Sequence, residues 1–298
     1  MATADTLVSV GLPVHNGADR IQDAVKSVLG QDHENLELVI GDNASTDGTE
    51  ELCRDLAAQD KRIVYHRNPV NTGLLNNFVG VMRLSRGTFF RWVGDDDWLA
   101  PTNVSRSLEA FAADDRSILV TTQLEYISPD GSVQTAEFHG DSLASEDPVA
   151  RFTEMLRLLN ESHLLVDPLY GLFRRAVVAD IDRRNMMRED EVFATKLALA
   201  GPWGHVPEVL GRRHWEAESV SALVRKLDLP PWHACFVTTL QCREILHWLA
   251  GCDLSPAERR RAQLEVARMY IRRQNIIAAR RGRKLARMAG IGARATVC

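Results

Sequence analysis

Phe89-Phe90-Arg91-Trp92-Val93-Gly94-Asp95-Asp96-Asp97-Trp98-Leu99-Ala100-Pro101 is the stretch from which the fold and a candidate site can both be predicted. A run of aromatic and β-branched residues leads directly into three carboxylates, which predicts a buried strand ending in an acidic loop. Adjacent carboxylates repel one another and raise one another's pKa. The simplest explanation for three adjacent carboxylates is a divalent cation with oxygen ligands, some of them from substrate phosphates. An Asp-rich surface turn is the alternative, but the flanking apolar residues favour a site.

Upstream of this stretch, a strand-like run, a polar loop and a helix-like segment follow one another three times. Strands are predicted at 7–14, 36–41 and 62–66, and helices at 19–29, around 52–57 and at 74–84. With the strand at 89–93, this repetition is typical of a parallel sheet with right-handed crossovers. Open sheets bind ligands at the carboxyl ends of their strands. We therefore expect His15-Asn16, Asp42-Asn43 and the three aspartates to meet at one rim.

Two common nucleotide-binding motifs are absent from the sequence. It contains no G-x-x-x-x-G-K-[ST], and His15-Asn16-Gly17 follows the first strand where a dinucleotide fingerprint would have G-x-G-x-x-G. Phosphates would therefore be held by a metal and not by a glycine-rich loop.

Four blocks resemble family 2 of the glycosyltransferases, and they stand in the right order: Val10–Asn16, Val39–Thr49, Asn71–Gly73 with Asn77, and Gly94–Pro101. The resemblance covers about the first 110 residues. It implies the α/β fold called GT-A, with a mostly parallel, Rossmann-like sheet flanked by helices. It also implies a nucleotide-diphosphate sugar as donor and a divalent metal, manganese or magnesium, as cofactor.

The resemblance also implies roles for single residues. Asp42 takes the place of the acid that contacts the nucleobase, and the other residues expected around the nucleotide are Pro13, His15, Asn16 and Asn77. Asp96 takes the place of the metal-binding acid, with Asp95 beside the ribose and metal. Asp97 is a further candidate metal ligand, so the ligand among the three aspartates stays open. The sequence departs from many relatives at His15, where they carry an aromatic residue, and at Gly41 and Gly94, where they carry Asp.

A second run of acids, Glu189-Asp190-Glu191, opens a predicted helix that ends at Gly201. Acids are favoured at a helix N-terminus by the dipole and the free N–H groups, which is the structural explanation. The functional explanation is a general base, because direct attack of an acceptor hydroxyl needs a carboxylate to take its proton. An acidic pair supplies it in relatives. We predict Asp190 as the base, with Glu189 or Glu191 as the alternative.

The segment Arg212-Arg213-His214 resembles the family's basic strand that ends in histidine. The arginines, Arg213 among them, could neutralise a departing diphosphate, and His214 could bind the metal. A lone histidine is more often structural.

The rest of the chain has fewer chemical signals. A hairpin is predicted over 117–140, and a helix over 147–159. Helices are predicted throughout from Pro230, including one of about 25 residues from Pro256. The expected division is 1–115 for the nucleotide-sugar half, 116–228 for the acceptor half and 229–298 for a basic helical region.

The overall charge of −4 conceals an asymmetry. Residues 231–298 carry 13 basic and 4 acidic residues, which leaves the first 230 residues strongly acidic. Three explanations fit the basic cluster (Arg272, Arg273, Arg280, Arg281, Arg283, Lys284, Arg287): a solvated helix face, contact with an anionic membrane, or nucleic-acid binding. Nucleic acid ranks last, because the body is acidic and the cluster lacks interleaved aromatics.

Composition sets further expectations. No apolar run is long enough for a transmembrane helix and no signal peptide is recognisable, so we expect a soluble, cytoplasmic protein, peripheral at the membrane at most. Five scattered cysteines suggest free thiols.

The leading hypothesis is an inverting glycosyltransferase acting on a glycan, a lipid-linked saccharide or a small natural product. A nucleotidyltransferase is the alternative enzyme, although the loop after the first strand lacks the glycine-rich, basic residues expected for a triphosphate. An inactive nucleotide-sugar-binding protein is the non-enzymatic alternative. Sugar, nucleobase, acceptor and oligomeric state are not readable from the sequence.

Overall fold

The computed structural model describes residues 5–162, 164–215 and 218–288. Within these ranges, nine strands form one sheet in the order β3-β2-β1-β4-β8-β6-β9-β5, with β7 paired to β6. The strands are β1 (Val8–Val14), β2 (Leu36–Asp42), β3 (Ile63–Arg67), β4 (Phe89–Trp92), β5 (Trp98–Leu99), β6 (Leu119–Ile127), β7 (Val133–Gln134), β8 (Leu172–Arg174) and β9 (Trp203–His214). The helices are α1 (Ile21–Leu29), α2 (Thr49–Gln59), α3 (Leu74–Leu84), α4 (Asn103–Ala113), α5 (Pro148–Glu161), α6 (Arg175–Ala179), α7 (Glu189–Ala200), α8 (Val220–Lys226), α9 (Val237–Gly251) and α10 (Pro256–Met288), with short 3-10 turns at Asp141–Leu143, Pro168–Tyr170 and Pro231–Cys235.

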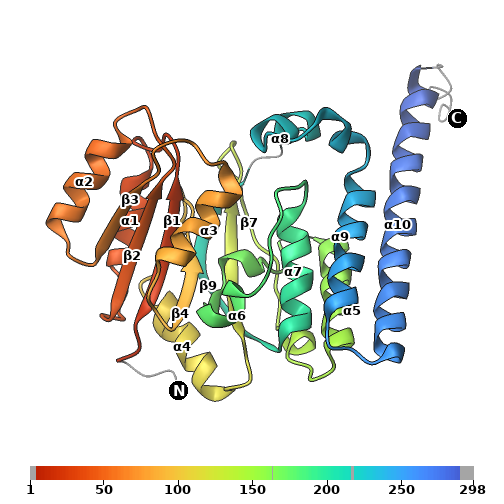
Figure 1. Cartoon of the computed structure of the whole chain (residues 1–298), viewed down its shortest axis with the longest axis horizontal. Helices are drawn as coiled ribbons and strands as arrows, with labels where there is room; N and C mark the ends of the chain where they lie inside the picture. Colours follow the sequence, from red (N-terminus) through yellow and green to blue (C-terminus); the bar gives the residue numbers. More distant parts are fainter. Residues whose placement is uncertain (1–4, 163, 216–217, 289–298) are drawn as a thin grey trace, which may run out of the picture.

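The first four strands form the parallel part of the sheet. β1 pairs in parallel with β2 and with β4, and β2 pairs in parallel with β3. Their carboxyl ends lie at one rim, at the top of Figure 1. The repeated strand-loop-helix pattern predicted this arrangement from the sequence.

Beyond β4 the sheet becomes mixed. β8 is antiparallel to both β4 and β6, β9 is parallel to β6, and β5 is antiparallel to β9. Parallel neighbours need a crossover of a dozen or more residues. The chain between Trp92 and Trp98 is too short for one, so β5 joins the far side of the sheet instead. The predicted succession of neighbouring parallel strands therefore holds for the first four strands, and of the later pairings the one between β6 and β9 is parallel.

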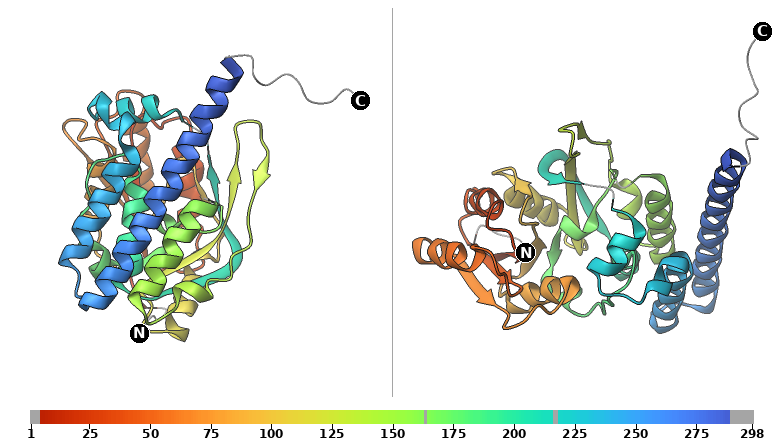
Figure 2. Two further views of the ribbon diagram at one scale, coloured as in Figure 1. Left: turned by 90° about the vertical axis from the view of Figure 1, so that its right-hand side faces the viewer. Right: turned by 90° about the horizontal axis from the view of Figure 1, so that it is seen from above.

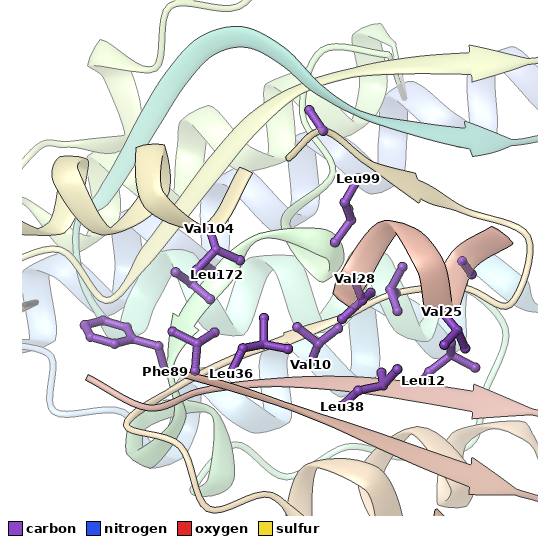
Figure 3. Close-up of a cluster of buried hydrophobic side chains, with 14 of the residues drawn as sticks. Val10, Leu12, Val25, Val28, Leu36, Leu38, Phe89, Leu99, Val104 and Leu172 are labelled. Atoms are coloured by element: carbon purple, nitrogen blue, oxygen red, sulfur yellow. The ribbon is translucent and has the colours of Figure 1, made fainter. Parts of the chain in front are cut away.

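Two apolar layers cover the faces of the parallel strands. Alternate residues of β1, among them Val10 and Leu12, pack against α1 and α4, as Figure 3 shows. On the other face, Phe90 and Trp92 pack with α3 and α7. Burial of these side chains fixes the strands, and with them the rim.

The C-terminal region adds a helical layer outside α7. A third cluster, with Phe152 of α5, Ile245 of α9 and Val266 of α10, joins these helices. α7 is buried around its whole circumference between Val192 and Ala198, because it lies between the sheet and this layer. Figure 2 shows α9 and α10 on the outer side of the molecule.

Several sequence predictions can be compared with these elements. The predicted helix at 147–159 is α5, and the hairpin is β6 with the short β7. α10 has 33 residues and exceeds its predicted length, because it continues past the body of the protein. α4, β5, β8 and α6 were not predicted. The three-part division stays a prediction, although one sheet runs through the first two parts.

No helix in the part of the chain described here is both long and apolar enough to cross a bilayer. Cys53, Cys235, Cys242 and Cys252 are free thiols, and Cys298 lies outside the described residues. Of the basic cluster, the side chains of Arg281, Lys284 and Arg287 lie outside the described set.

Candidate functional site

Loops from β1, β2 and β4 meet at the carboxyl rim. The Asn16 backbone N–H donates to Ser45 Oγ at 2.9 Å, and Asn16 Oδ1 accepts from the Thr46 backbone N–H at 2.8 Å. Gly17 packs so closely on Asp95 that a Cβ there would lie 2.6 Å from Oδ2. Residues from three distant blocks are therefore brought together.

The predicted nucleobase contact, Asp42, is fully buried at the end of β2. Its Oδ2 accepts from the Tyr65 hydroxyl at 2.9 Å and from Arg67 at 2.5 Å, and its Oδ1 accepts from the Ser45 N–H at 2.9 Å. Burial opposes ionisation, but the hydrogen bonds from Ser45, Tyr65 and Arg67 outweigh it and lower the pKa of Asp42. Arg67, with 28% of its side chain exposed, is the member of this pair that solvent reaches.

The other residues expected around the nucleotide differ in exposure. Pro13 is buried within β1, whereas His15 is exposed, with Nε2 3.4 Å from Asn71 Nδ2. Asn77 is buried on α3 and donates to the Gly41 carbonyl at 2.7 Å. Asn77 thus ties α3 to the carboxyl ends of β1 and β2, and its expected place beside the nucleotide stays a prediction.

Close packing explains the two glycines, Gly41 and Gly94, at which the sequence departs from the family pattern. A Cβ on Gly41 would lie 2.4 Å from Cγ1 of Val81, and a Cβ on Gly94 would lie 2.8 Å from Oδ2 of Asp97. No side chain fits at either position without rearrangement.

The three aspartates of the β4–β5 loop have different surroundings. Asp95 pairs with Arg20 at 2.8 Å, and Asp97 pairs with Arg213 at 3.3 Å. The side chain of Asp96 is 41% exposed and forms no salt bridge with a described lysine or arginine; His214 lies 3.9 Å from it. Of the three, Asp96 alone is left without an arginine.

Burial raises the pKa of both outer aspartates, against the pull of their arginines. Asp97 also accepts from the Gly94 N–H at 2.8 Å, so its carboxylate is engaged from two sides. This geometry favours Asp96 over Asp97 as the residue that is free to bind a metal.

His214 faces Asp96 from the end of β9. Its Nδ1 lies 2.8 Å from the backbone carbonyl of Asp96. A carbonyl can only accept, so Nδ1 carries the hydrogen and Nε2 of the neutral ring keeps a free lone pair.

Arg213 lies one residue earlier and joins several groups. It donates to Asp167 at 2.6 Å and stacks 3.5 Å from the ring centroid of Tyr170, while its Nε contacts Asp97. Burial opposes its charge, but Tyr170, Asp97 and Asp167 raise its pKa well above the usual value. Its positive charge is shared between two carboxylates.

The second acid run, at the start of α7, repeats the pattern of the first. Glu189 pairs with Arg183, through 2.7 Å and 2.5 Å contacts, and Glu191 pairs with Arg273 of α10 at 2.7 Å. Asp190 forms no salt bridge with any described lysine or arginine. Arg188 is close enough for the charge of Asp190 to act on its pKa, and the acids Glu191, Asp167 and Glu189 act on Asp190 itself.

Asp190 lines a pocket of about 870 Å³ between α3, α7, α8, α9 and α10. Water reaches its carboxylate through this pocket, but the enclosing protein raises the pKa to about 6. Burial is the largest cause, and the negative charges of Glu191, Asp167 and Glu189 add to it. A carboxylate with this pKa is ionised at neutral pH and still basic enough to accept a proton.

Tyr170 connects the pocket with the rim. Its ring lines the pocket on one side and carries the Arg213 guanidinium on the other. Tyr170 therefore lies between the pocket that contains Asp190 and the ion pairs of Arg213 at the rim.

Sequence reasoning missed the partners of these acids: Arg20, Arg67, Asp167, Tyr170, Arg183 and Arg273. Arg183 lies six residues from Glu189, but Arg213 and Asp97 are 116 positions apart. No spacing rule could have paired the distant ones.

The model of the family described as Glycosyl transferase family 2 matches residues 9–182, more than half of the chain. The chain belongs to glycosyl transferase family 2. The matched segment includes Asp42 and the three aspartates, whereas the family 2 match ends before Asp190 and His214.

Curated relatives of this family 2 chain align over its first part. The abequosyltransferase RfbV of Salmonella typhimurium is 36% identical over 103 residues, 33% of this chain and 31% of that protein. The chondroitin synthase of Pasteurella multocida is 32% identical over 127 residues, 43% of this chain and 13% of that protein. The chain thus spans less than a third of the length of either relative.

Solved structures show the fold of the family 2 chain. TarS of S. aureus, crystallised with UDP-GlcNAc, superposes with a TM-score of 0.64 at 15% identity, over 89% of this chain and 72% of that one. The mannosyltransferase PcManGT of Pyrobaculum calidifontis, crystallised with GDP-Man and Mn²⁺, gives 0.52 at 16% identity, over 96% and 81%. The predicted GT-A fold is confirmed, with a helical C-terminal part.

Proposed function

We propose that this family 2 chain transfers a sugar from a nucleoside-diphosphate donor to an acceptor hydroxyl, with inversion at the anomeric carbon. One observation carries the proposal: in each acid run, arginines neutralise the outer two carboxylates and leave the middle one open. The fold and the names of the relatives support a sugar transfer.

The donor set at the rim fits a divalent cation. Among the described residues, no cluster of three or more His, Cys, Asp and Glu could hold an ion by itself. Mg²⁺ and Mn²⁺ sites in such enzymes commonly use one or two protein ligands, completed by substrate phosphates. Asp96 and His214 would hold the ion, and the cation would offset the charge that develops on the departing diphosphate.

The chain's own residues perform the acid-base work. Asp190 accepts the proton of the acceptor hydroxyl as its oxygen attacks the sugar carbon from the side opposite the leaving group. A single displacement of this kind inverts the configuration. Arg183 and Arg273 hold the neighbouring glutamates, so these acids do not compete for the proton.

Arg213 acts through its neighbours in this proposal. Because Asp97 and Asp167 share its charge, it positions the end of β9 and keeps His214 beside Asp96. Arg67, which is partly exposed, and His15 are polar groups at the nucleobase end, with Asp42 holding Arg67 in place.

Product analysis tests the proposal. The full chain is incubated with Mn²⁺, a panel of nucleoside-diphosphate sugars and a mixture of alcohol and saccharide acceptors. Release of nucleoside diphosphate, together with an acceptor-sugar product of inverted anomeric configuration by ¹H NMR, is expected. Retained configuration would contradict the single displacement. Donor binding without any release would indicate a binding module, and pyrophosphate release from a triphosphate would indicate a nucleotidyltransferase.

A further inference from the structure

Aliphatic side chains, here together called the aliphatic wall, line part of the pocket that contains Asp190. They come from four elements outside α7 and comprise Leu74 and Leu75 of α3, Leu223 and Leu227 at α8, Val237 of α9 and Ile277 of α10. Carbohydrate alone would not use such a wall, because sugar hydroxyls need hydrogen-bonding partners. The wall can bury a chain of methylene groups.

Part of this wall is open to solvent. Leu74, Val220 and Phe236 line the pocket and are 46%, 45% and 52% exposed. Trp232, also 52% exposed, lies beside Phe236 with ring centroids 6.3 Å apart. Exposed apolar groups gathered at one pocket mark a binding surface, since their burial by a ligand is favourable.

The charged residues that line the pocket indicate which class of ligand it favours. Arg183 and Arg188 line the pocket. Glu189 pairs with Arg183, and Glu191 lies 3.5 Å from Arg188 while it also pairs with Arg273. Arg280 also lines it, and no described carboxylate forms an ion pair with it. Among the described residues of the lining, Arg280 is therefore the arginine without a salt bridge and Asp190 the carboxylate without one.

The face of α10 turned to the pocket supplies Gln274, Ile277 and Arg280, at helical spacing. In Figure 1 this end of α10, α8 and the carboxyl rim lie at the same end of the molecule. An acceptor can therefore reach Asp190 while contacting α8 and α10.

We propose that the acceptor is an anionic amphiphile: its hydroxyl lies at Asp190, its anionic group at Arg280, and its aliphatic chain along α3, α8 and the start of α9. This inference rests on the proposed function, because it names the acceptor of the same site.

The experiment measures binding, which needs no knowledge of the sugar. Decyl phosphate, below its micelle concentration, is titrated into the full chain by calorimetry. Inorganic phosphate and neutral decyl glucoside are the comparison ligands. We expect one decyl phosphate per chain, bound at least about tenfold more tightly than inorganic phosphate, because the aliphatic chain is buried.

Substitutions on the exposed wall locate the ligand. Phe236→Asp and Val220→Asp should each weaken decyl phosphate about tenfold. Ile271→Asp is the matched control, because Ile271 is 59% exposed on α10 and does not line this pocket. Arg280→Gln should weaken decyl phosphate about threefold to tenfold and leave decyl glucoside unchanged.

Three results would overturn the proposal. Equal affinity for inorganic phosphate and decyl phosphate would show that the aliphatic chain does not contribute to binding. An unchanged affinity for decyl phosphate in Arg280→Gln would show that Arg280 does not bind the anionic group. Equal losses in Ile271→Asp and Phe236→Asp would show adsorption of detergent outside the pocket. Stabilisation by nucleoside diphosphate with Mn²⁺ is measured in parallel, since its absence would count against the proposed function and not against this inference.

Discussion

The two acid runs, Asp95–Asp97 and Glu189–Glu191, are built alike although one lies in a loop and the other starts a helix. In both, arginines neutralise the outer acids, and the middle acid forms no salt bridge with an arginine. They differ in their surroundings. Both side chains are reached by solvent, but Asp96 lies beside His214, whereas Asp190 lies in a pocket where desolvation and neighbouring acids raise its pKa to about 6. With the same arrangement of charges, the unpaired acid can thus bind a cation in one run and accept a proton in the other.

Replacement of Asp190 should have the largest effect. Asp190→Asn removes the proton acceptor and should lower turnover by about 10²–10⁴-fold, while the KM for the donor stays within about twofold. Steady-state rates and donor titration measure both. Asp253→Asn, an exposed acid between α9 and α10, is the control and should behave like the unchanged protein. Near-normal turnover in Asp190→Asn would show that Asp190 is not the general base.

Replacement of the open acid should separate Asp96 from its neighbour. Asp96→Asn should abolish the stabilisation by nucleoside diphosphate that depends on Mn²⁺ and lower activity about 100-fold, because the cation loses its carboxylate. Asp97→Asn should instead lower the free energy of unfolding by about 1–3 kcal/mol, since Arg213 loses a buried partner. Thermal shift and urea unfolding measure these changes. If Asp97→Asn were the variant that lost the Mn²⁺ effect, the ligand assignment would be reversed.

The pH dependence of the rate should report the ionisation of Asp190. Asp190 must be ionised to accept a proton, and its raised pKa is about 6. The logarithm of kcat/KM should therefore fall by about one per pH unit below 6 and level off above it. A rate that stays constant down to pH 4.5 would show that an acid with an ordinary pKa, or none, is the base.

Arg273 offers a smaller test of the same site. It neutralises Glu191, whose charge already raises the pKa of Asp190. Arg273→Gln should move the midpoint of the pH profile upward by less than about one unit, because Glu191 keeps only the longer contact with Arg188. The exposed neighbour Arg272, changed to Gln, is the control. A lower rate with an unmoved midpoint would indicate a purely structural role for Arg273.

Local sequence patterns predicted the first half of the fold well. The alternation of apolar runs and turn residues placed β1 to β4, and the acids after β2 and β4 reached one rim because parallel strands share their direction. The start of α7 was also predicted from its acids and apolar spacing.

The ion pairs of the site and the order of the later strands depend on tertiary contacts, which no local sequence pattern contains. Nothing near Asp97 indicates that Arg213 will pair with it, and nothing near Glu191 indicates Arg273 of α10. The order of β8, β6, β9 and β5 likewise follows from packing on a sheet already formed. Which acid of each run stays open could therefore be read only from the structure.

The irregular pairing of β9 with β6 has a consequence for insertions and deletions. Twelve residues of β9 lie opposite nine of β6, with register shifts between Thr122 and Leu124. Side chains of a strand alternate between faces, so removal of one residue from Pro207–Leu210 would exchange the sides to which Arg213 and His214 point. The length of this segment is constrained by parity: a change of two residues preserves the orientation of both side chains, and a change of one inverts it.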